Sequence, residues 1–166
     1  MFNNKGSSTF TAFKVNKIRT WQPNIQYLSI FYDDRVVFAK IGGQLSEMGV
    51  GGITGTVLGG VVGGLVGDAI DKRLKKGSQE SKGDKMREIF EKDHEEILAM
   101  DKNNFEILYY DMTKVDMKKS GYGLSGFRTG TISFEGKRKE KFDIAANQAY
   151  EVCEEIVKNY LADKME

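Results

Sequence analysis

The longest uncharged stretch of the chain, residues 48–67, reads MGVGGITGTVLGGVVGGLVG. Two small residues alternate with two larger ones, and this pattern repeats four times. In a strand, side chains alternate with period two, so neither face would be uniform; in a helix, residues four apart share a face. The repeat therefore predicts a glycine-zipper helix within an insert at 42–76. Its packing groove would be lined by Gly51, Gly55, Gly59, Gly60, Gly63, Gly64 and Gly67.

Such a helix needs a partner or an apolar solvent, because each glycine costs about 0.8–1 kcal/mol relative to alanine. Twenty residues at about 1.5 Å each match the roughly 30 Å of a bilayer core. The spacing of small residues is typical of closely packed membrane helices. A cytoplasmic, headgroup-contacting flank is indicated by the basic residues that follow, Lys72, Arg73, Lys75 and Lys76.

The glycines also lower the hydrophobicity of this segment. The alternatives to a membrane helix are a buried helix or an ordered loop packed inside a soluble oligomer, and disorder. The pattern leaves open whether the segment spans, lies on or avoids the bilayer.

Elsewhere the apolar positions are typical of strands rich in β-branched and aromatic residues. Residues 25–32 and 35–41 predict a hairpin that turns at Asp33-Asp34. A first strand is predicted within 10–21, stopped by Pro23. Later strands are predicted at 105–110 and 113–119, followed by a hairpin of 127–134 and 139–144.

Two further segments have helical periodicity. After a linker-like stretch at 77–84, residues 85–100 predict a charged helix, so 77–102 form a linker and helix. Residues 145–162 predict an amphipathic helix that docks on the sheet. Its apolar face would comprise Ala149, Val152, Cys153, Ile156, Val157, Tyr160 and Leu161. Strands followed by a docking helix indicate an α+β fold.

The succession FEILYYDMTKVDMKKSGYG, RTGTISFEG and KEKFDIAANQAYEVCEEIVKNYL resembles the second half of a bacterial pleckstrin-homology-like (PH-like) domain. The resemblance covers residues 103–162, with the hairpin 25–41 as the earlier strands. It implies a partly open antiparallel β-barrel of about seven strands, capped by the C-terminal helix. The domain would be split into 10–41 and 103–166 by the insert, after a polar tail at 1–9.

The composition of the chain argues against several classes of function and site. A net charge of +1 over 166 residues lacks the basic footprint of a nucleic-acid-binding protein. The single cysteine, Cys153, excludes an internal disulfide and a CxxC metal site. The N-terminal residues have no apolar run, so we expect no signal peptide and an intracellular location.

The sequence contains few candidate catalytic residues. His94, the sole histidine, lies on the charged helix, and Cys153 lies on the predicted apolar face of the last helix. The acids Asp33-Asp34, Asp111 and Asp116 suit turns and strand ends, and the glycines lack a GK[ST] ending. We therefore expect no catalytic, cofactor-binding or metal-binding residues. A basic hairpin tip, Lys137-Arg138-Lys139 with Lys141, is a weaker candidate for headgroup contact.

Together these features predict a non-enzymatic scaffold or interaction protein at the cytoplasmic face of the membrane. It would contact the bilayer through 48–67, self-associate through the glycine zipper and display the PH-like domain to a protein partner that the sequence does not identify. The alternative is a cytoplasmic, soluble homo-oligomer whose zipper helices pack in its core.

Overall fold

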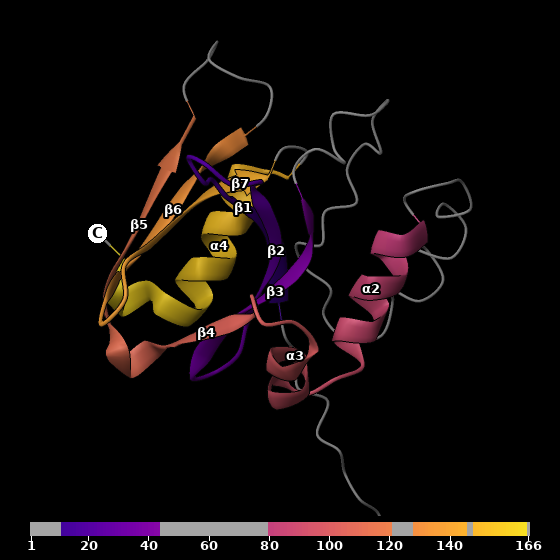
Figure 1. Ribbon diagram of the computed structural model, residues 1–166. Helices are drawn as coiled ribbons and strands as arrows, with labels where there is room; N and C mark the ends of the chain where they lie inside the picture. The colour runs from indigo at the N-terminus through magenta and orange to yellow at the C-terminus, as the bar shows by residue number, and fades with distance from the viewer. Residues whose placement is uncertain (1–10, 44–79, 121–127, 146–147, 166) are drawn as a thin grey trace, which may run out of the picture.

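The computed structural model describes residues 11–43, 80–120, 128–145 and 148–165. These residues form a seven-stranded antiparallel sheet, in the order β4-β3-β2-β1-β7-β6-β5, with helices on both faces (Figure 1). The elements are β1 (Thr11–Lys17), β2 (Ile25–Phe31), β3 (Arg35–Gly43), α2 (Glu80–Phe90), α3 (His94–Met100), β4 (Phe105–Leu108), η3 (Tyr109–Asp111), β5 (Met112–Lys119), β6 (Arg128–Gly136), β7 (Glu140–Ala145), α4 (Tyr150–Leu161) and η4 (Ala162–Lys164). The predicted α+β class is confirmed, with its antiparallel strands and C-terminal helix. The sheet is not closed into a barrel.

The predicted hairpin of β2 and β3 is confirmed. Phe31 pairs with Val36, and the Tyr32 N–H donates to the Arg35 carbonyl at 2.8 Å across the turn. Every residue of β2 is buried. A strand buried on both faces requires cover on both sides of the sheet.

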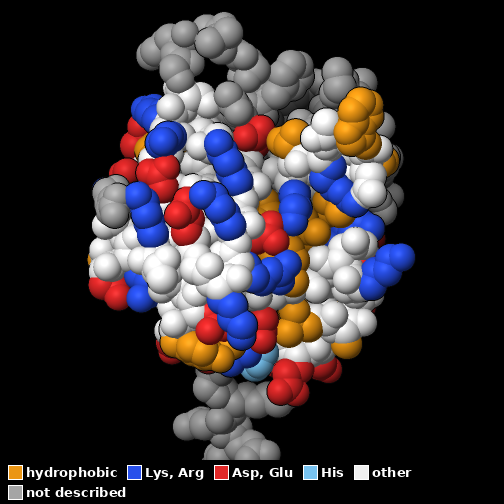
Figure 2. Space-filling model, turned by 60° about the vertical axis from the view of Figure 1, so that its left-hand side comes forward, with side chains coloured by type: hydrophobic (Ala, Val, Ile, Leu, Met, Phe, Trp, Pro, Cys, Tyr) orange, Lys and Arg blue, Asp and Glu red, His pale blue; other side chains and the backbone are white. Residues whose placement is uncertain are grey.

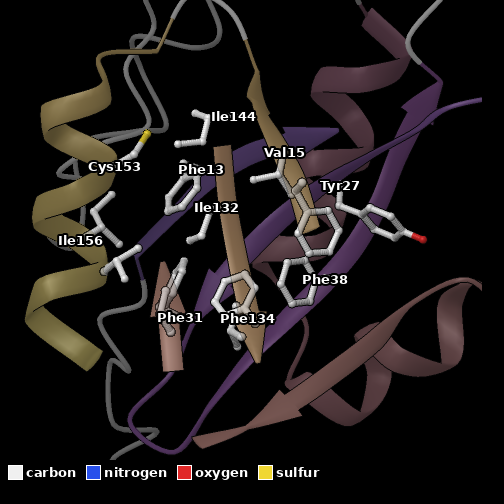
Figure 3. Close-up of a cluster of buried hydrophobic side chains, with 14 of the residues drawn as sticks. Phe13, Val15, Tyr27, Phe31, Phe38, Ile132, Phe134, Ile144, Cys153 and Ile156 are labelled. Atoms are coloured by element: carbon white, nitrogen blue, oxygen red, sulfur yellow. The ribbon is translucent and has the colours of Figure 1, made fainter. Parts of the chain in front are cut away.

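That cover comes from two hydrophobic cores. On one face, α4 packs through Cys153, Ile156 and Val157 against aromatic and β-branched residues of the strands (Figure 3). On the other face, Ile89 of α2 and Ile97 of α3 pack against β1, β2 and β3. The sheet residues in this second core are Ala12, Leu28, Ile30, Val37, Ala39 and Ile41.

A stack of three phenylalanines shows how strongly the sheet curls. Phe38 of β3 stacks on Phe142 of β7 with ring centroids 4.7 Å apart, although β2 and β1 lie between these strands in the sheet. Neighbouring strands are about 4.8 Å apart, so a flat sheet would hold β3 and β7 roughly three times farther apart than the rings are. The ring of Phe105 of edge strand β4 also stacks on Phe38, with ring centroids 4.8 Å apart.

Gly136 permits the close approach at the start of β5. A Cβ atom at this position would lie 2.1 Å from the Asp111 carbonyl oxygen and 2.8 Å from the Met112 Cα. Both neighbours are backbone atoms, which cannot move aside as a flexible side chain can. Glycine here lets the end of β6 cross directly over η3 and the first residue of β5.

The structure corrects the predicted helices. The single charged helix at 85–100 is two helices, because Asp93 caps α3 by accepting the Glu96 N–H at 2.9 Å. The segment 77–84 is not all linker, since α2 begins at Glu80. The last helix begins at Tyr150 rather than 145. Ala149, which was predicted to belong to its apolar face, is exposed, whereas Tyr150, which was not, is buried.

The first strand is also shorter than predicted. It ends at Lys17, so residues 18–24 form the connection to β2. The predicted polar tail at 1–9 and the glycine-zipper helix at 48–67 lie outside the described residues, so both stay predictions.

Replacing Phe38 by alanine should destabilise the fold by about 3–5 kcal/mol, because it removes the central ring of the stack and leaves a cavity. The free energy of unfolding, measured by urea titration, checks this. Tyr110→Ala is the matched control: Tyr110 is 80% exposed, so its truncation should change stability by about 0.5 kcal/mol or less. Equal effects of the two substitutions would contradict a stabilising role for the stack.

Candidate functional site

The main predicted site residues lie beyond the described part of the chain. The groove glycines between Gly51 and Gly67, and the basic flank from Lys72 to Lys76, all fall within 44–79. What the structure does place is the point where this segment leaves the sheet. Gly43, the last residue of β3, pairs with Ile25, the first residue of β2. The segment therefore starts beside the connection between β1 and β2.

The predicted basic tip lies between β6 and β7, and three of its cations lie close to carboxylates. Lys137 Nζ lies 3.8 Å from an Asp111 oxygen. Lys139 Nζ lies 2.8 Å from a Glu135 oxygen, and Arg138 is 3.0 Å from Glu140. Lys141 is exposed on β7. The neighbouring carboxylates reduce the positive potential of the tip, so it is a weaker anionic-lipid contact than its sequence indicates.

The residues considered for catalysis do not converge: Cys153 lies on α4 in the first core, whereas His94 and Asp34 lie near each other, at the start of α3 and in the β2–β3 turn. Burial raises the pKa of the Cys153 thiol to about 12, so this side chain is protonated at neutral pH. His94 begins α3 and packs edge-on against Tyr32, with ring centroids 6.0 Å apart. A hydrogen bond from Arg35 lowers the pKa of Asp34 in the β2–β3 turn.

A cluster that the sequence did not predict lies where the outer end of the phenylalanine stack meets β1 and β7. We call Lys17, Phe105, Arg138 and Glu140 the stack-end cluster. Glu140 is 8% exposed and pairs with both cations, at 2.6 Å to Lys17 Nζ and 3.0 Å to Arg138. The Arg138 guanidinium lies 4.7 Å from the centre of the Phe105 ring, and Lys17 Nζ lies 5.6 Å from it.

These contacts have identifiable energetic roles. A carboxylate this buried needs its charge paired, and a guanidinium over a ring face gains a cation–π attraction. Tyr27 completes the surroundings by donating its hydroxyl to the Asn103 carbonyl at 3.1 Å. The pKa of Tyr27 is raised, first by burial and then by the charge of Glu140. The cluster carries a net charge of +1 from two cations and one carboxylate, and its members come from β1, β4, β7 and the β6–β7 tip.

The β1–β2 connection, residues 18–24, carries the most exposed large apolar side chain among the described residues. Trp21 is 94% exposed, and Ile18 is 52% exposed. The connection is closed by the Arg19 N–H, which donates to the Asn24 side-chain oxygen at 2.9 Å. Sequence reasoning placed Trp21 in the first strand; Pro23-Asn24, a typical turn signal, indicated the connection that the structure shows.

The surface that includes the β6–β7 hairpin has mixed charge. Figure 2 brings forward the left-hand side of Figure 1 and shows Lys and Arg side chains interspersed with Asp and Glu, with hydrophobic side chains visible between them. Among the described residues, no group of three His, Cys, Asp or Glu side chains could hold a metal ion. No helix in the described ranges is both long enough and apolar enough to cross a membrane.

Replacing Glu140 by glutamine should lower the free energy of unfolding by about 1–3 kcal/mol. Glu140 is buried, and its negative charge pairs with both Lys17 and Arg138; glutamine removes that charge. Chemical denaturation at pH 7 measures this. Glu151→Gln removes an exposed carboxylate that pairs with Lys119 and should leave the denaturation midpoint unchanged. A silent Glu140→Gln would show that the stack-end cluster does not stabilise the sheet.

Comparison with known proteins leaves the function to be argued from these features: no protein-family model, no curated protein and no solved structure matches the chain.

Proposed function

We propose that the chain is a non-enzymatic, membrane-associated scaffold or interaction protein. In this proposal, the segment 48–67 forms a glycine-zipper helix that contacts the bilayer and self-associates, while the sheet domain is displayed on the cytoplasmic side as a PH-like protein-binding module. The observation that carries the proposal is the four-residue repeat of small residues followed by Lys72, Arg73, Lys75 and Lys76. At a helix–helix contact within lipid, the small residues of the repeat would let two backbones approach closely, and the larger residues would pack beside them.

The position of the insert supports the proposal. The strands on either side of it pair directly, from Arg35 with Leu108 to Phe38 with Phe105. The strand that follows the insert, β4, is therefore the neighbour of the strand that precedes it, β3. A segment attached in this way can occupy a different solvent from the domain while the pairing of β3 with β4 stays intact.

The architecture of the described residues supports the display of a binding module. The antiparallel sheet with a C-terminal helix packed on one face supports this part of the proposal, because the PH-like resemblance implies such a sheet and helix. Two potential reacting groups lie apart: Cys153 is buried on the sheet-facing side of α4, whereas His94 lies at the start of α3. Function through a surface is the interpretation that uses these features most directly.

Gly59→Leu should abolish self-association, because a leucine side chain fills the groove in which a second helix would pack. Val61→Leu is the matched control, since it enlarges a residue on the ridge and leaves the groove open. Oligomer size in detergent, measured by light scattering, should fall for Gly59→Leu and stay constant for Val61→Leu. An unchanged size in the Gly59→Leu variant would refute the zipper.

The membrane half of the proposal predicts that the expressed protein stays in the membrane fraction after a carbonate wash and is released only by detergent. Hydrophobic contact with the bilayer core resists high pH, whereas contact through surface charges does not. Immunoblotting of the washed pellet and supernatant provides the measurement. Recovery of a discrete oligomer without detergent would instead favour the soluble assembly with zipper helices in its core.

A further inference from the structure

Trp21 lies on the surface, where a folded domain rarely exposes so large an apolar side chain. It is 94% exposed, and Ile18 adds a second exposed apolar side chain to the same connection between β1 and β2. The connection has a defined shape, because the Arg19 N–H donates to Asn24 Oδ1 and Pro23 restricts the backbone. The fold therefore presents these side chains outward. A tryptophan, with an apolar body and one N–H donor, suits a surface that is apolar on one side and wet on the other.

The charges around Trp21 favour an anionic surface. Residues 18–24 include Arg19 and no acidic residue. Burial raises the pKa of the nearby Tyr27 hydroxyl; the charges of Glu140 and Asp101 raise it further, and those of Arg19 and Arg138 lower it. In the stack-end cluster, Glu140 offsets one of the two charges of Lys17 and Arg138. Asp101 is paired with Lys40 at 3.5 Å. With Arg19, these side chains total four cations (Lys17, Arg19, Lys40 and Arg138) against two carboxylates (Asp101 and Glu140).

The topology places this connection at the end of the sheet from which the glycine segment departs. Gly43 of β3 pairs with Ile25, which directly follows the connection. Tyr110, which is 80% exposed, lies beyond the opposite end of β3, because Leu108 pairs with Arg35. The two exposed aromatic residues thus lie at opposite ends of this strand.

We infer that residues 18–24 form a membrane contact, in which Trp21 and Ile18 enter the interface of an anionic bilayer and Arg19 lies at the headgroups. This inference rests on the proposed membrane association and adds an orientation, with the β1–β2 end of the domain facing the lipid. The aromatic side chain would gain burial that the folded domain does not provide, and Arg19 would gain electrostatic attraction to anionic lipid.

The chain offers a direct test because Trp21 is its single tryptophan. The full-length protein is mixed with vesicles of phosphatidylcholine and phosphatidylglycerol, with and without bromine on the acyl chains. Trp21 emission should shift to shorter wavelength and be quenched by the brominated lipid. The matched control, the double variant Trp21→Phe with Tyr110→Trp, moves the single indole to the other end of β3 and should show neither effect.

The outcomes separate this inference from the function on which it rests. Co-sedimentation with vesicles but no quenching of Trp21 would overturn the membrane contact at 18–24 and leave the membrane association standing. A blue shift without bromine quenching would overturn it in favour of burial against protein, for example a second copy of the chain. Absence of co-sedimentation would overturn both proposals. Equal quenching in vesicles of phosphatidylcholine alone would refute the role of Arg19.

Discussion

The stack of Phe142, Phe38 and Phe105 is the contact on which the sheet's shape depends. The hydrogen-bonded ladder leaves β4 and β5 as edges, so it does not by itself hold β3 against β7. The phenylalanine rings do so, at 4.7 and 4.8 Å, and Phe134 adds an edge-on contact to Phe38 at 5.6 Å. Aromatic pairs contribute about 0.5–1.5 kcal/mol each beyond the burial of their area. The stack ends at Arg138, which lies over Phe105, so the core is continuous with the stack-end cluster.

Curling the sheet around this stack also determines what must cover its outer face. Towards β1, β2 and β3, that face is apolar and is covered by α2 and α3. Towards β5, β6 and β7, the outer face presents polar side chains, which can remain in contact with water. Examples are Asp116, Ser133 and Lys141, which lie at directly paired positions on the three strands. The helices after the insert are therefore part of the fold, because without Ile89 and Ile97 the apolar half of this face would meet solvent.

The sequence predicted the elements whose signals are local. The β2–β3 hairpin followed from two β-branched and aromatic runs separated by Asp33-Asp34, and the C-terminal helix followed from its apolar face. The division of the charged helix was missed even though Asp93 and Glu96 form a capping box, because the helical periodicity continues across the break. The stack-end cluster could not be predicted, since Lys17, Phe105 and Arg138 are far apart in the sequence and meet only because the sheet curls.

The same geometry explains how the sheet accommodates a long excursion between two paired strands. The entropy of closing a loop rises only slowly with its length, so the pairing of β3 and β4 depends chiefly on local contacts at the return. Asn104 supplies two of them: its side-chain oxygen accepts the Lys40 N–H at 2.8 Å, and its amide donates to the Ile97 carbonyl of α3 at 2.7 Å.

Farther along β4, Arg35 reaches Glu106 at 2.9 Å, and the Tyr109 N–H donates to the Asp34 carbonyl at 3.0 Å. Strand β4 is thus held at both ends as well as by the stacking of Phe105. The register of this short edge strand is therefore set by contacts within the described domain.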